Sequence, residues 1–134
     1  MINRKLLVAL LLVPASTSAM ADEWIYVGRG DIENVSYAKP SSISKHGHIA
    51  TMWTMQDFKN ARSLVELKYL SMRSQNEYDC NEEQSRTISG IFYSGKMASG
   101  DVVYSYNESN GEWFPVAQNS LGSLMLNVAC SSQK

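Results

Sequence analysis

The stretch NSLGSLMLNVAC, residues 119–130, predicts a short amphipathic helix close to a cysteine near the end of the chain. Four apolar side chains follow the i, i+3, i+4, i+7 spacing of a single helix face, namely Leu121, Leu124, Met125 and Val128. At about 100° per residue, Cys130 falls opposite this face of an ideal helix. We therefore expect the helix to end near Val128 or Ala129, with Cys130 in the irregular residues that follow.

The other end of the sequence predicts export. A basic start, an unbroken apolar run and a stretch of mostly small residues follow one another within residues 3–21. This order is typical of a cleaved signal peptide, and the small-x-small rule favours cleavage between Ala21 and Asp22. The apolar run is much shorter than the about 20 residues that span a bilayer. We expect a signal peptide over residues 1–21 and a mature domain over residues 22–134 without a transmembrane segment.

The two cysteines of the chain predict one disulfide. Cys80 and Cys130 are the only cysteines in the sequence, and exported proteins fold where thiols oxidise. The bridge would tie the C-terminal helix to a strand in the middle of the chain. On the loop-entropy model, closing the loop between residues 80 and 130 contributes about 4 kcal/mol to the stability of the domain.

The middle of the chain reads as a succession of strands. Runs rich in β-branched and aromatic residues alternate with turn residues such as glycine, asparagine and proline. The predicted strands cover residues 23–29, 34–38, 48–58, 69–80, 86–94 and 101–106. Pro40 is expected to end the second strand, because proline cannot donate to a sheet ladder. Residues 59–66 are polar and predict a loop or one helical turn.

The strand at residues 69–80 carries the clearest alternation. Its even positions place Cys80 on the same face as Leu70, Met72 and Tyr78, which predicts that this face is buried and that the odd face meets water. Strands first and one helix last predict an α+β fold. We expect a meandering antiparallel sheet of about six strands, with the C-terminal helix packed on one face and tethered by the disulfide.

Two stretches resemble catalytic motifs without meeting their chemistry. The stretch GIFYSGKM, residues 90–97, lacks the glycine-rich interior of a phosphate-binding loop and the hydroxyl residue that follows its lysine. Ser42 and Lys45 have the spacing of a Ser-x-x-Lys nucleophile, but the supporting motifs of those enzymes are absent. We therefore predict no catalytic residues and no cofactor, and we expect that the chain is not an enzyme.

Three other groups of residues favour structural roles. His46 and His48 could share a strand face, but the sequence offers no further metal ligand beside them, so a solvated turn is expected and no metal is predicted. A solvated edge is expected for the acidic residues Glu77, Asp79, Glu82 and Glu83. The three tryptophans are expected in the core rather than in a ligand platform, namely Trp24, Trp53 and Trp113.

The charge balance excludes one class of partner. The sequence has 12 lysines and arginines against 13 acidic residues. Removal of the signal peptide would take away Arg4 and Lys5 and leave a net charge of about −3. A nucleic-acid-binding domain would instead carry a basic stripe. We therefore expect no nucleic-acid partner.

Several short fragments, taken in order, resemble the surface-adhesin protein E-like domain family. They include WIYVG at residues 24–28, PSSI at 40–43, EYDC at 77–80, YSG at 93–95 and VAC at 128–130. The resemblance runs from residue 23 to residue 130. It implies a six-stranded antiparallel sheet with a C-terminal helix held across it by a Cys80–Cys130 disulfide. The family takes its name from a bacterial cell-surface adhesin that engages host matrix proteins.

The resemblance leads to a functional expectation with one alternative. We expect an exported, non-enzymatic binding module of the bacterial envelope, with adhesin-like binding to a host or envelope protein or other macromolecule. The alternative is a periplasmic protein that binds a small ligand or acts as an inhibitor, with a pocket lined by tyrosine and tryptophan between sheet and helix. No lipidation cysteine lies near the predicted cleavage point, which favours the periplasm over the cell surface or the medium.

Overall fold

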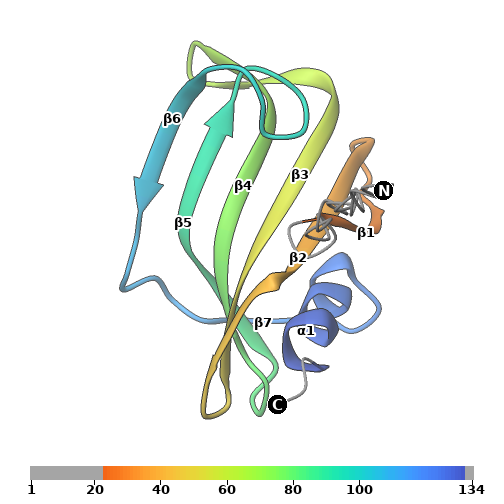
Figure 1. The fold of residues 1–134 in the computed structure, drawn as a ribbon, viewed down its shortest axis with the longest axis vertical. Helices are drawn as coiled ribbons and strands as arrows, with labels where there is room; N and C mark the ends of the chain where they lie inside the picture. The colour runs from red at the N-terminus through yellow and green to blue at the C-terminus, as the bar shows by residue number, and fades with distance from the viewer. Residues whose placement is uncertain (1–22, 132–134) are drawn as a thin grey trace, which may run out of the picture.

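The computed structural model describes residues 23–131, so the predicted signal peptide and its cleavage point between Ala21 and Asp22 lie outside the described residues. It contains one antiparallel sheet and one helix (Figure 1). The elements are β1 (Ile25–Arg29), β2 (Asn34–His46), β3 (Ile49–Leu64), β4 (Leu67–Asp79), β5 (Gln84–Tyr93), β6 (Val102–Asn107), β7 (Phe114–Pro115) and α1 (Leu121–Ser131). Strands β1 to β6 lie side by side in chain order, and the two-residue β7 pairs with β5. The predicted meander with one C-terminal helix is therefore present.

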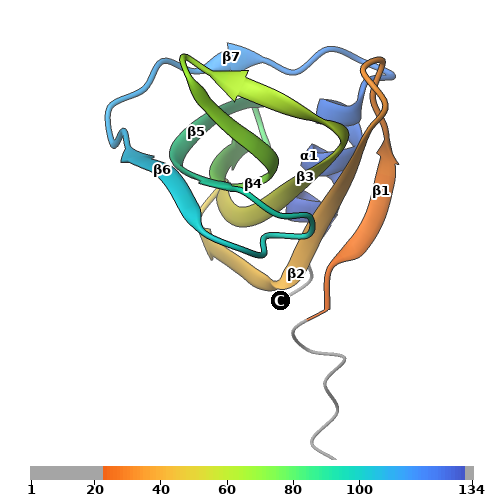
Figure 2. The same cartoon turned by 90° about the horizontal axis from the view of Figure 1, so that it is seen from above.

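The sheet is strongly curved, and α1 lies in its hollow (Figure 2). The helix contacts β1, β2, β3 and β4. We name the sheet face that carries α1 the inner face and the opposite one the outer face. Because directly paired residues of neighbouring strands share a face, the register assigns each side chain to one of the two.

The main core lies between α1 and the inner face. It consists of Ala38, Ala50, Met52 and Tyr78 from the sheet and Met125, Leu126 and Ala129 from the helix. Leu124 of the predicted apolar stripe is 45% exposed, whereas Leu126, outside that stripe, is 7% exposed. The buried face of the helix is thus shifted toward Leu126 and Ala129 from the face that the spacing predicts, and Met125 belongs to both faces.

The predicted position of Cys130 after the end of the helix is wrong. The residue lies inside α1, which continues to Ser131, and the helix does not end at Val128 or Ala129 as predicted. Turning the helix moves Cys130 from the far side of the predicted stripe to the flank of the face that is buried. The predicted disulfide with Cys80 forms from there, with a Cα–Cα distance of 5.7 Å. Lys45 Nζ also donates a hydrogen bond to the Cys130 carbonyl oxygen over 3.1 Å.

A second cluster stabilises the other end of the sheet. Phe58, Tyr69 and Phe92 are buried together, with ring centroids 5.6 Å apart for Phe58 and Tyr69 and 4.8 Å apart for Tyr69 and Phe92. The loop between β5 and β6 is held against this end, because Lys96 Nζ donates to the Phe58 carbonyl oxygen over 2.7 Å. A small domain therefore divides its apolar side chains between two clusters.

Two predicted strand ends are wrong. β2 continues through Pro40 to His46, because the register shift between Lys39 and Ser44 removes proline from the regular ladder. In that bulge Ser42 Oγ accepts a hydrogen bond from the Trp53 amide over 2.9 Å. Residues 59–66 do not form a loop or helical turn. β3 runs to Leu64 and pairs with β4 again after a second register shift.

The predicted exposure of the odd face of β4 also needs correction. The odd face of β4 is not uniformly wet, since Tyr69 packs in the second cluster and Ser71 is fully buried. Ser71 Oγ is held by the β5–β6 loop, where it donates to the Gly95 carbonyl oxygen and accepts from the Ala98 amide. Cys80 does pack with Tyr78 in the main core, as the alternation predicts.

The three tryptophans are half-buried and do not belong to either buried cluster. Each ring instead carries a cation over its face, with the cationic atom 5.6 Å, 5.3 Å and 4.5 Å from the ring centroid. The pairs are Lys39 on Trp24, Arg73 on Trp53 and Arg86 on Trp113. The register places Lys39, Trp53 and Arg73 on the outer face, where these pairs cover what would otherwise be bare sheet.

Candidate functional site: a polar cleft on the inner face

A band of polar side chains crosses the inner face between the two apolar clusters. Paired positions of β2 to β5 supply it, because Ser36 lies opposite Gln56, and Asn76 lies opposite Thr87. Thr54, opposite Ala38, completes the band beside the main core. Hydroxyl and amide groups therefore occupy the centre of a face that is apolar at both ends.

A chain of hydrogen bonds fixes this band. Thr87 donates its hydroxyl proton to Asn76 Oδ1 over 2.7 Å, and Asn76 Nδ2 donates to Thr54 Oγ1 over 2.9 Å. Thr54 Oγ1 in turn donates a hydrogen bond to the Ser74 carbonyl oxygen over 3.5 Å. Because each link sets the orientation of the next, the Asn76 side chain is held in one position.

The band forms the floor of a hollow beneath the start of α1. This hollow measures about 170 Å³. Its floor is formed by Ser36, Thr54, Gln56 and Asn76, and α1 covers it with Leu121, Gly122 and Met125. Tyr78 closes one side of this hollow. Burial raises the pKa of its phenol, and a hydrogen bond to the Asn76 side chain partly opposes this rise.

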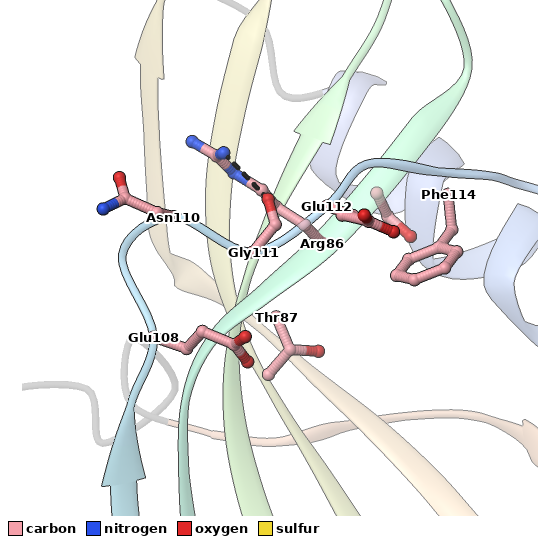
Figure 3. A pocket seen from close by; sticks show the side chains of 8 residues that line it. Arg86, Thr87, Glu108, Asn110, Gly111, Glu112 and Phe114 are labelled. Carbon is pink, nitrogen blue, oxygen red and sulfur yellow. Dashed lines mark hydrogen bonds between the residues drawn. The ribbon is translucent and has the colours of Figure 1, made fainter.

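A second, larger hollow of about 540 Å³ lies along β5 (Figure 3). The two share Ser85. The larger hollow exists because β6 pairs with β5 only from Ser89 onward, while β7 pairs with Gln84 and Ser85. The connection at residues 108–113 crosses the open stretch and forms the outer wall. We name the two hollows together the inner cleft.

The outer wall is held at both ends. The Glu108 amide donates to the Ile88 carbonyl oxygen over 2.8 Å, and Arg86 Nη1 donates to the Gly111 carbonyl oxygen over 3.2 Å. Arg86 and Thr87 extend to opposite sides of β5 (Figure 3). Arg86 is also bound by Glu77, with 2.8 Å between Nε and Oε1. Its charge is therefore compensated on the side away from Thr87.

Exposed aromatic rings lie at the larger hollow and on β6. Phe114, paired with Ser85, is 61% exposed and lines the larger hollow. On β6, Tyr104 and Tyr106 are stacked with ring centroids 6.2 Å apart, and Tyr104 is 45% exposed. Burial, followed by the nearby Glu108 carboxylate and Tyr104, raises the pKa of Tyr106. Of these rings, Phe114 lines the inner cleft, whereas Tyr104 and Tyr106 are not among its lining residues.

The inner cleft is negative rather than positive. Glu108 and Glu112 line the larger hollow. Among the described residues that line the two hollows, Arg86 is the single basic one, and Glu77 compensates it. Such a site favours neutral or cationic groups over anions.

The residues that resemble catalytic or metal sites are separated and engaged elsewhere. Residues 90–93 lie in β5 and Lys96 binds a backbone carbonyl, so no helix follows the apparent phosphate loop. Ser42 and Lys45 lie in β2 and not in the predicted loop, and their side chains bind the Lys39 and Cys130 carbonyl oxygens. Among residues 23–131 no group of three or more His, Cys, Asp and Glu side chains could hold a metal.

The histidines and the acidic residues have structural positions. His46 and His48 flank the turn between β2 and β3, and His48 Nε2 lies 3.6 Å from Asp79 Oδ2. Asp79 Oδ1 accepts the amides of Asn81 and Glu82, each over 3.0 Å, and so shapes the turn after β4. His46, His48 and Asp79 are not among the residues that line the inner cleft, whereas Glu77 of the acidic group binds Arg86 at its wall.

The comparisons with known proteins agree with the fold. The pattern of the family described as surface-adhesin protein E matches residues 24–131. A crystal form of Haemophilus influenzae protein E superposes with a TM-score of 0.59 at 11% identity, covering 79% of this chain and 87% of that one. A structure of protein E from non-typeable Haemophilus influenzae gives 0.55 at 10% identity, covering 79% and 75%. No curated protein matches this sequence significantly.

Proposed function

This chain belongs to the surface-adhesin protein E family, and we propose that it is an exported, non-enzymatic binding module of the bacterial envelope. Its work would be adhesin-like binding to a host or envelope macromolecule. The predicted signal peptide over residues 1–21 would provide export. Within the described residues, no helix is long and apolar enough to cross a membrane.

The observation that carries the proposal is the inner cleft with the exposed ring of Phe114. Phe114 lines the larger hollow and is 61% exposed, so it leaves apolar surface in water that a partner could cover. The cleft is lined from β5, from the 108–113 connection and from α1, so a ligand would touch several elements at once. Support for a binding role therefore comes from the site as well as from the family.

The proposed location is the periplasm, with the cell surface or the medium as alternatives. The chain has no cysteine beside the predicted cleavage point that could take a lipid. Fractionation of cells that express the full chain tests this location. Recovery of the disulfide-bonded protein in the cytoplasm would contradict the proposal, because adhesion requires export.

A binding assay tests the function itself. The oxidised mature protein is applied to immobilised outer-envelope extracts and to host matrix proteins, and saturable binding to at least one of them is expected. Phe114→Ala should weaken that binding, because Phe114 lines the larger hollow. Tyr26→Ala is the matched control, because Tyr26 is 59% exposed and pairs with Tyr37 on the outer face. No saturable binding to any of these surfaces would overturn the proposal.

A second candidate function, a periplasmic carrier of a small ligand, is favoured by the hollow beneath α1. The predicted pocket between sheet and helix exists, with Tyr78 among its lining residues, but the described lining includes no tryptophan. At about 170 Å³ it is smaller than the about 300–1,000 Å³ of common ligand sites. Extraction of the purified periplasmic protein followed by mass spectrometry would find a bound small molecule if this second function holds.

A further inference from the structure

We propose that the groove between β1 and α1 binds an extended peptide segment, which adds a strand to the free edge of β1. The segment would carry an apolar side chain toward α1 and a carboxylate toward Arg29. This inference goes beyond the proposed function, which rests on the inner cleft, because it names a second surface and the chemistry of its partner. Three properties of the groove carry it: a free backbone edge, an apolar wall and the charge of one arginine.

β1 leaves one backbone edge without a partner strand. It lies at one end of the sheet, and within residues 23–131 its single neighbouring strand is β2. The Gly30 amide donates to the Asn34 carbonyl oxygen over 2.8 Å, so the N–H of residue 30 points toward β2. Because successive residues of a strand direct their N–H groups to opposite edges, the N–H and C=O of Arg29 point away from β2. These groups can pair with the backbone of another extended chain.

α1 stands on the inner side of this edge and forms a groove with it (Figure 2). The groove measures about 530 Å³, which is within the about 300–1,000 Å³ of common ligand sites. Gly28 and Arg29 line it from β1, and Leu121, Leu124 and Asn127 are among the residues that line it from α1. A chain that pairs with β1 would therefore have a helix face beside it.

The wall that α1 supplies is apolar. A Cβ atom at Gly28 would lie 2.5 Å from Leu121 Cδ2 and 3.8 Å from Leu124 Cδ1, so the bare backbone of β1 rests against both leucines. Leu124 is nevertheless 45% exposed. A strand added to β1 would direct every second side chain toward this wall. An apolar side chain there would remove the exposed part of Leu124 from water.

The charge of the groove selects among extended peptides. Arg29 is the one charged residue among the described residues that line the groove, and it forms no ion pair within residues 23–131. A carboxylate of the partner would be attracted by this guanidinium, and an ammonium group would be repelled. Because Arg29 is exposed, the attraction is modest and orders related peptides rather than supplying most of the affinity.

A second copy of the chain is the competing occupant. The two edge strands of the sheet are β1 and β6, and neither contains an aspartate or glutamate. Pairing of either strand of a second copy with β1 would therefore leave Arg29 without a carboxylate from that strand. Sedimentation of the free protein as a dimer, with the Arg29 amide already protected from exchange, would overturn the inference in favour of this occupant.

The test is a titration of the oxidised mature protein with short peptides, followed by amide NMR shifts and amide exchange. The probe is acetyl-TVTVTE-amide. We expect it to shift the amides of Gly28, Leu124 and Asn127 and to slow the exchange of the Arg29 amide. No response to the probe at millimolar concentration, or shifts confined to β6, would overturn the inference.

Four altered peptides separate the three properties. Acetyl-TSTSTE-amide should bind about tenfold more weakly than the probe because it lacks apolar side chains. Acetyl-TVTVTK-amide should bind about threefold more weakly because its charge is reversed. The probe is also N-methylated either at both valines or at the second and third threonines, and the form methylated on the edge that faces β1 should lose about tenfold in affinity. Equal binding of all five peptides, or binding that neither methylated form weakens, would contradict strand addition.

Variants assign the binding to the groove. Leu124→Ala should weaken binding of the probe about fivefold, because the apolar wall is lost. Leu67→Ala is the matched control, since Leu67 is 44% exposed at the start of β4 and does not line the groove. Arg29→Glu, at an exposed position, should reverse the order of the peptides that end in glutamate and lysine. Unchanged affinities in Leu124→Ala and an unchanged order in Arg29→Glu would overturn the inference.

The peptide titration and the assay on immobilised targets fail independently. Saturable binding to an immobilised target without any response to the probe would overturn the peptide groove and leave the binding function standing. Binding of the probe at the groove without saturable binding to any immobilised target would support the groove and contradict the proposed function.

Discussion

Gly90 has no side chain, and the ring of Tyr106 on the neighbouring strand occupies the space that a Cβ atom there would need. The two residues are directly paired across β5 and β6, and a Cβ at residue 90 would overlap the edge of the tyrosine ring. The glycine therefore lets Tyr106 lie down over the inner face beside Phe92 and Tyr104. One missing side chain therefore sets the position of an aromatic ring on the inner face.

Gly90→Ala should lower the free energy of unfolding by about 1–3 kcal/mol, the usual cost of overpacking. The ring of Tyr106 must move to make room for the added methyl group. Gly111→Ala is the control, because a Cβ there would meet its nearest neighbour at 3.5 Å, an ordinary contact. Urea denaturation of both variants measures the difference. Equal stability of Gly90→Ala and the parent protein would show that Tyr106 does not rest on Gly90.

The orientation of α1 gives a second prediction. Leu126→Ala should cost about 2–5 kcal/mol, because Leu126 is buried in the main core. Leu124→Ala, two residues earlier on the same helix, should cost well under half as much because its side chain is 45% exposed. Thermal or urea unfolding of the two variants checks this order. The reverse order would restore the helix orientation that the i, i+3, i+4, i+7 spacing predicts.

Local pattern predicts where the elements lie better than it predicts which face each one buries. The strand alternation around Tyr78 and Cys80 is strong enough to place both in the main core. In α1, by contrast, apolar residues cover more than one face, and the i, i+3, i+4, i+7 spacing predicts that Leu124 is buried rather than Leu126. The disulfide and the curved sheet decide the rotation. Both are tertiary constraints that act from outside the helix.

Register shifts explain the strand ends that the sequence does not predict. Pro40 is a strand breaker by local rules, but a bulge carries β2 past it and Ser42 replaces a missing backbone acceptor. Likewise, residues 59–63 read as a polar loop, but β3 continues through them and pairs with β4 again from Arg62 to Leu64. Local composition cannot show pairing that depends on a partner strand.

The inner cleft has no sequence motif. Its floor comes from four strands, and its wall comes from a connection that reads as an ordinary turn around Asn110 and Gly111. One signal is visible in the sequence. Ser74 and Asn76 lie on the same face of β4 as Met72 and Tyr78. They therefore mark a polar interruption in a face that points inward. Its function depends on neighbours that only the fold brings together.

The Cys80–Cys130 bridge should supply a large share of the stability of the domain. The two residues are 50 positions apart, and replacement of both by serine should lower the free energy of unfolding by about 4 kcal/mol. Replacing both avoids a free thiol that could form dimers. Urea denaturation of the oxidised parent and of the double variant measures the difference. A loss below about 1 kcal/mol would mean that packing of Met125, Leu126 and Ala129 holds the helix alone.

Tyr78 should make the protein lose stability in alkali. Its pKa is raised in the folded state by burial, from an ordinary value of 10.0, so the unfolded chain gives up the proton first. Below pH 10 both states keep the proton and the contribution is constant. Above it the free energy of unfolding should fall by up to about 1.4 kcal/mol per pH unit until the folded state ionises too. Tyr78→Phe should remove this slope.

The slope difference between Tyr78→Phe and the parent, measured by urea denaturation from pH 8 to 11, isolates the effect from other titrations. Tyr26→Phe serves as the control for the loss of an exposed phenol, since Tyr26 is 59% exposed. The phenylalanine variant also loses the contact with Asn76, so its stability at neutral pH should shift by a constant that cancels in the slope. Parallel curves for the parent and Tyr78→Phe above pH 10 would contradict a buried, protonated phenol beneath α1. In that case the floor of the inner cleft would be open to water at Tyr78, and the hydrogen-bonded order of Asn76 and Thr87 would have to come from the strands alone.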